Sequence, residues 1–107
     1  MATLPAVRST RMMVERLQVG DADLGVSYAD VFVVVREGEP GPGPNDWEVT
    51  LRTCDPHHLE PGEHDLRLEA ADGSHLAGRA LLRYSDGSRH LFRGDGELSG
   101  YDDPDLA

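Results

Sequence analysis

Two copies of the tripeptide Asp-Gly-Ser, fourteen positions apart, constrain the fold of this chain more than any other feature of its sequence. The first begins at Asp72 and the second at Asp86, and both lie between segments in which apolar and polar residues alternate. Asp-Gly between such segments is a strong hairpin signal, because both residues tolerate a positive φ. We therefore predict strands near 64–71, 75–84 and 89–94, joined as an antiparallel β-meander.

A run of β-branched and aromatic residues between Leu24 and Glu37 predicts another strand. Successive side chains of a strand point to opposite faces, so alternate valines form one face and Phe32 and Val34 form the other. Both faces of this strand are therefore apolar. Because a small domain cannot easily enclose both of them, we expect a partner to cover the face that carries Phe32 and Val34.

Three further segments complete the predicted organisation. Residues 47–53 alternate cleanly, which indicates a half-buried antiparallel strand. Residues 11–19 fit helical spacing as well as strand alternation, and we favour a strand. Residues 97–101 are a candidate short strand, and residues 38–45 alternate Gly and Pro, which predicts an exposed loop.

A length of 107 residues fits one domain, 1–107. We expect residues 1–10 to be a loose leader and residues 102–107 to be a frayed acidic tail. The fold predicted between them is all-β, with about six strands in a small antiparallel barrel or a two-layer sandwich. Small residues in the middle of strand 75–84, Gly78 and Ala80, give it a narrow waist that suits a curved sheet or a barrel.

Charge excludes two classes of partner. Ten basic residues, all of them Arg, stand against 20 acidic ones, and the net charge is -10. Such a chain repels the phosphates of nucleic acids and of anionic membranes. The sequence has neither an apolar run long enough to span a membrane nor a signal-peptide pattern, and its single cysteine, Cys54, cannot form an internal disulfide. We therefore expect a cytoplasmic location.

The segment from Cys54 to His64 contains the side chains that are most typical of a metal-binding or catalytic site. It offers a thiol, imidazoles and carboxylates, all of which zinc accepts. However, the spacing matches no paired metal-binding pattern, and no strand-turn-helix nucleophile elbow accompanies the serines. We therefore expect no catalytic residues, no metal and no cofactor, and the sequence favours a non-catalytic role over an enzymatic one.

Arg79 and Arg83 share a face of the predicted strand 75–84. Two guanidinium groups on one face could bind an anionic ligand or an acidic partner. A solvated face, or pairing with a cross-strand carboxylate such as Glu69, is the more common arrangement, and we favour it.

Without a catalytic cluster, the two-sided apolar strand leads to a non-catalytic protein-interaction or assembly module that self-associates, with Phe32 and Val34 at the interface. A subunit that binds a different protein fits the same pattern. The alternative function is a small-ligand-binding barrel, either a carrier or a small enzyme, with an aromatic-lined pocket. The side chains available to line that pocket are Tyr28, Trp47, Tyr84 and Phe92.

Overall fold

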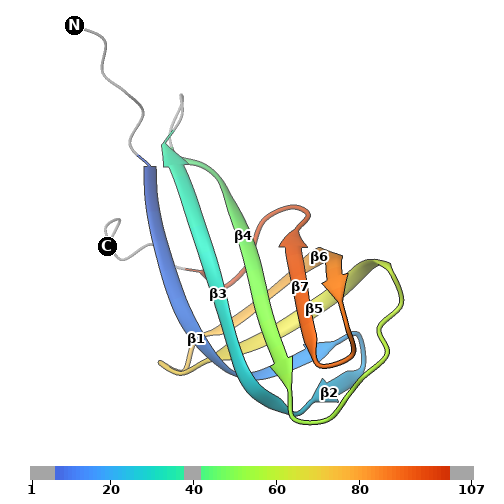
Figure 1. The fold of residues 1–107 in the computed structure, drawn as a ribbon. Helices are drawn as coiled ribbons and strands as arrows, with labels where there is room; N and C mark the ends of the chain where they lie inside the picture. The colour runs from blue at the N-terminus through green and yellow to red at the C-terminus, as the bar shows by residue number, and fades with distance from the viewer. Residues whose placement is uncertain (1–6, 38–41, 102–107) are drawn as a thin grey trace, which may run out of the picture.

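The computed structural model describes residues 7–37 and 42–101, which form β-strands and connecting turns with no helix (Figure 1). The all-β prediction is therefore confirmed. The strands are β1 (Val7–Val19), β2 (Ala22–Leu24), β3 (Val26–Glu37), β4 (Pro42–Thr53), β5 (Gly62–Ala70), β6 (His75–Ser85) and β7 (Arg89–Gly94).

Six of these strands close into an antiparallel barrel, in the order β1-β3-β4-β7-β6-β5, and β2 is an additional strand paired with β1. Closure depends on β1, whose first half pairs with β3 and whose second half pairs with β5. The register shifts between Val14 and Arg16, where β1 begins to pair with β5. A bulge bends a strand and increases its twist, so this irregularity lets one strand serve two neighbours. Of the two architectures that the sequence left open, barrel and sandwich, the structure is therefore a barrel. β1 is a strand, as predicted for residues 11–19.

The C-terminal meander β5-β6-β7 is confirmed, but the chemistry of its turns differs from the prediction. Only the glycines have a positive φ, 92° at Gly73 and 102° at Gly87, whereas Asp72 and Asp86 do not. The aspartates act through their side chains instead: Asp72 Oδ1 accepts the backbone N–H two residues ahead at 2.9 Å. Asp86 Oδ1 accepts those two and three residues ahead, at 3.1 and 2.8 Å. These backbone hydrogen bonds lower the pKa of both carboxyls.

Trp47 fills the narrow part of the barrel interior. Its side chain is buried, and its Nε1 donates a hydrogen bond to the carbonyl of Gly96 at 2.9 Å. Its ring lies directly against Gly78 of β6 and Gly94 of β7. A Cβ added at Gly94 would lie 2.3 Å from Trp47 Nε1, and one at Gly78 would lie 2.5 Å from Cζ2. Gly78, one of the two small residues predicted to form a waist, therefore makes room, together with Gly94, for the largest side chain of the core.

The alternation predicted for the central strand is confirmed. Val31, Val33 and Val35 of β3 are buried, while Phe32 and Val34 on the outer side remain partly exposed. β3 pairs with β4 along most of its length, but β7 pairs with β4 only across residues 48–52. The upper parts of β1, β3 and β4 consequently extend beyond the meander, as Figure 1 shows.

The ends of two predicted segments differ in the structure. Residues 7–10 belong to β1 rather than to a loose leader, because β3 is long enough to pair with them. Residues 42–45 belong to β4 rather than to the Gly/Pro loop, and the strand begins at Pro42, where the missing N–H is tolerated. Residues 1–6, 38–41 and 102–107 lie outside the described part of the chain. The acidic tail predicted for residues 102–107 therefore lies outside it as well.

Residues 97–101 do not form the short strand predicted for them. Ser99 makes an isolated antiparallel bridge to Ala77, while Leu98 is buried in the core. The backbone φ values of Gly96 and Gly100, 107° and 84°, are incompatible with a continuous extended strand. The segment therefore runs alongside β6, bridged to it at Ser99, and packs the side chain of Leu98 against the core.

Candidate interaction surface

The outer face of the barrel carries four exposed large apolar side chains. Their exposed fractions are 47% for Met13, 38% for Tyr28, 51% for Tyr84 and 37% for Leu91. Strand register places three of them in a single cross-strand row that crosses five strands. We call this the outer row, and its members in order are Met13, Asp30, Thr50, Leu91 and Tyr84.

Asp30 is a buried carboxyl group within this outer face. The hydroxyl of Tyr28 donates to Asp30 Oδ2 at 2.5 Å, and a guanidinium nitrogen of Arg11 lies 3.9 Å from the same oxygen. The same guanidinium stacks over the ring of Phe32, 5.4 Å from its centroid. The hydrogen bond to Asp30 raises the pKa of the Tyr28 hydroxyl. Asp30 is thereby compensated by polar partners, as a buried acid requires.

Phe32 and Val34 border a hollow of about 180 Å³ on the outer side of β3, β4 and β7. Its remaining lining includes carboxyl groups of β4 and the guanidinium of Arg93 on β7. The predicted interface residues are therefore neighbours, next to side chains of both charges. We call this region the Phe32 surface, and it consists of Phe32, Val34, Asp46, Glu48 and Arg93.

The two predicted arginines have different surroundings. Arg79 pairs with Asp65 at 3.6 Å and with Glu63 at 3.7 Å, both on the neighbouring β5. Glu69, the carboxylate named from the sequence as a partner, instead lies 3.9 Å from Arg16 of β1. Arg83 is exposed at a register shift between β6 and β7. Arg79 is thus a paired surface charge rather than an open anion site.

The aromatic residues proposed to line a ligand pocket do not share one cavity. Trp47 and Phe92 are buried inside the barrel, whereas Tyr28 and Tyr84 lie exposed outside it. Strand alternation places Trp47 and Phe92 inward and Tyr28 outward. Tyr84 has the same parity as the buried Leu76 and Ala80 of β6, and the register shift between Leu82 and Tyr84 turns it outward instead.

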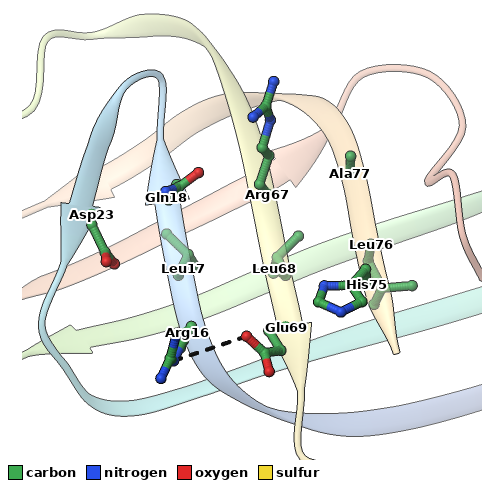
Figure 2. A pocket seen from close by; sticks show the side chains of 10 residues that line it. All are labelled: Arg16, Leu17, Gln18, Asp23, Arg67, Leu68, Glu69, His75, Leu76 and Ala77. Carbon is green, nitrogen blue, oxygen red and sulfur yellow. Dashed lines mark ion pairs between the residues drawn. The ribbon is translucent and has the colours of Figure 1, made fainter. Parts of the chain in front are cut away.

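A groove of about 320 Å³ crosses β2, β1, β5 and β6 on another side of the barrel. Arg16 and Glu69 in its lining form an ion pair at 3.9 Å, and His75 lies on the other side of Glu69 (Figure 2). Arg67 and Asp23 add one more charge of each sign. The groove is therefore charge-balanced and exposed, with no strong preference for one kind of ion.

The loop from Cys54 to His64 shows no convergence of its ligand-type side chains. Cys54 is an exposed free thiol, and His58 pairs with Glu60 at 3.2 Å. His64 already belongs to β5, and its Nε2 makes a 2.5 Å hydrogen bond with the carbonyl of Glu60, which ties the loop to that strand. Within residues 7–37 and 42–101, no three potential ligands are grouped so that they could hold a metal ion.

One buried histidine, with a serine beside it, was missed by the sequence analysis. His90 of β7 points inward, its Nδ1 lies 2.8 Å from the hydroxyl of Ser85, and its Nε2 is buried without a partner. The alternation that places Phe92 inward also places His90 inward, so a signal was present. A serine beside a histidine suggests a nucleophile and base, but Nε2, the other ring nitrogen, has no hydrogen-bond partner among the described residues, so no carboxylate holds the imidazole as in a catalytic triad.

Burial lowers the pKa of His90 below its ordinary value of 6.5, although the charge of Asp86 acts in the opposite direction. The folded protein therefore binds a proton at His90 less readily than the unfolded chain does. Its contribution to stability is complete above pH 6.5 and is lost as pH falls from there through the lowered pKa. We expect the urea midpoint of unfolding to decrease when the pH is lowered from about 8 to about 5.5. The decrease should be smaller in His90→Leu.

The matched control is His75→Gln, which removes an exposed histidine. It should leave the pH dependence as in the unsubstituted protein. An unchanged pH dependence in His90→Leu would show that His90 does not couple protonation to folding.

Comparison of the chain with protein-family models, with curated proteins and with solved structures finds no match. In the part of the chain that the structure describes, no helix is long and apolar enough to cross a membrane. The class that the fold defines is an antiparallel all-β barrel of six strands with one additional strand.

Proposed function

We propose that this chain is a non-catalytic protein-interaction module that self-associates through the Phe32 surface. The observation that carries the proposal is the outer face of β3, where Phe32 and Val34 are still partly exposed although the opposite face of the same strand fills the core. Contiguous apolar surface on a small domain is typical of a contact with another protein.

The composition of the Phe32 surface supports a second copy of the chain as the partner. A two-fold contact places the same surface on both subunits, so it must be complementary to itself. Glu48 and Arg93 lie opposite each other on β4 and β7, directly beside Phe32. A surface that carries both charges around an apolar centre can pair its acids with the partner's arginines, despite the net charge of -10.

A cytoplasmic location belongs to the same proposal. The thiol of Cys54 is exposed and unpaired, which suits a reducing compartment.

The test is the molar mass of the untagged protein by light scattering across a dilution series. We expect a dimer whose dissociation constant rises at least about tenfold in Val34→Glu, equivalent to about 1.4 kcal/mol, because a charge is then buried in the contact. Gln18→Glu, on the outer side of β1 beside the groove, adds the same charge away from the Phe32 surface and should leave the dimer intact. A monomer at every concentration would refute self-association.

Binding of a small polar ligand is the second candidate, and the groove of about 320 Å³ on β2, β1, β5 and β6 is the observation in its favour. This volume lies at the lower end of known small-molecule sites. The two functions differ in the same experiment, because ligand binding in this groove requires no second copy. A monomer whose melting temperature rises with small zwitterionic compounds would support the second candidate.

A further inference from the structure

The opposite end of the outer face from the Phe32 surface has a different character. Tyr28 of β3 lies opposite Arg52 of β4, and Arg52 lies opposite Arg89 of β7. This line adjoins the outer row, which contributes the exposed side chains of Leu91 and Tyr84. We call this region the arginine end, and its members are Met13, Tyr28, Arg52, Tyr84, Arg89 and Leu91.

Arg52 and Arg89 are like charges placed directly opposite each other, an arrangement that costs stability in a sheet. Both side chains are exposed, and neither guanidinium has an ion-pair partner in residues 7–37 and 42–101. By contrast, Arg11, Arg16 and Arg79 all face carboxylates. Arg67, Arg83 and Arg93 also have no ion-pair partner in the described residues, but of these five arginines only Arg52 and Arg89 lie directly opposite each other.

Two carboxylates of this region, Asp30 and Asp86, already have other donors. Asp30 accepts the hydroxyl of Tyr28 and lies near Arg11. Asp86 accepts two backbone N–H groups of its own turn and the hydroxyl of Tyr84 at 3.2 Å. Arg89 lies near enough to Asp86 for its charge to help lower the pKa of that carboxyl, but neither Arg89 nor Arg52 forms an ion pair within the described residues.

We propose that the arginine end docks a different protein through an acidic segment that carries apolar side chains between its carboxylates. Guanidinium groups recognise carboxylates with two parallel hydrogen bonds, and the exposed Leu91, Tyr28 and Tyr84 would take the apolar side chains of the same segment. The net charge of -10 repels an acidic partner elsewhere, so the local excess of arginine selects where such a segment approaches. This surface is separate from the Phe32 surface, and its partner is not a second copy.

The test is a titration by fluorescence anisotropy with a labelled synthetic peptide that alternates glutamate and leucine. We expect binding that weakens with added salt, and that weakens about tenfold when Arg52→Gln and Arg89→Gln are combined. Arg67→Gln is the matched control, because Arg67 is an exposed arginine on β5 that also lacks an ion pair in the described residues. A peptide with glutamine in place of glutamate should not bind.

Four outcomes would overturn the proposal. The acidic peptide fails to bind, or Arg67→Gln weakens binding as much as Arg52→Gln, which indicates unspecific attraction. Inorganic phosphate at matched ionic strength displaces the peptide, which indicates a site for small anions. Finally, light scattering of the combined arginine variant separates the two surfaces: an unchanged molar mass is expected, and loss of a dimer would assign the arginine end to the contact between copies.

Discussion

Trp47→Ala is expected to remove most of the stability of this barrel. The indole is buried and fills the space between β6 and β7 that their glycines leave open, so its loss creates a large cavity. Truncation of a buried tryptophan costs about 3–5 kcal/mol, a large part of the roughly 5–15 kcal/mol that stabilises a typical domain. Thermal unfolding should show a melting temperature lower by more than about 10 °C.

Trp47→Phe separates the two contributions of this side chain. Phenylalanine keeps much of the apolar contact but loses the hydrogen bond from Nε1 to the carbonyl of Gly96. We expect a smaller loss than in Trp47→Ala. If the free energy of unfolding of Trp47→Ala lies within about 1 kcal/mol of that of the unsubstituted protein, the packing described for Trp47 is wrong.

Gly94→Ala is expected to destabilise the protein by about 2–3 kcal/mol through overpacking. The added methyl group would lie 2.3 Å from Trp47 Nε1 and 2.4 Å from Cε2, so the ring or the strand must move. The ring has little freedom to move, because Gly78 on the neighbouring strand is also in close contact with it. The urea midpoint of the variant measures the loss.

Gly25→Ala is the matched control for this substitution. Its nearest atoms to an added Cβ belong to Cys54 at 3.9 Å, an ordinary contact, and its φ is not positive. A glycine of this kind should tolerate alanine with no loss, or with a gain of about 0.4–1 kcal/mol.

A double-mutant cycle attributes the effect of Gly94→Ala to the ring. In a Trp47→Leu background the methyl group no longer meets the indole, so the same substitution should cost clearly less than in the unsubstituted protein. An equal cost in both backgrounds would mean that the strain arises from the backbone rather than from Trp47.

Several parts of the candidate surfaces were accessible from sequence alone. The exposure of Phe32 and Val34 follows from the alternation of β3, because neighbours in a strand face opposite sides. The inward position of His90 follows from the same rule applied to β7, although its bond to Ser85 requires the register of β6 against β7.

Other parts depend on residues that are distant in sequence. Arg52 and Arg89 become neighbours only through the pairing of β4 with β7, which joins strands separated by two others in the chain. The ion pairs of Arg79 depend on the register of β6 against β5, and the sequence suggested the wrong carboxylate. Alternation predicts the face on which a side chain lies, but not which side chain of another strand stands beside it.

The sequence by itself determined most local features of this protein: the main strands apart from the short β2, the faces of their regular parts, and the positions of the two tight turns of the meander. These features arise from interactions within a few residues, which period and turn chemistry report directly. The tertiary structure decided that the sheet closes into a barrel, because closure requires the bend in β1 that lets it pair with both β3 and β5. It also decided that Trp47 lies against Gly78 and Gly94, because close packing of the core joins residues that have no local relation.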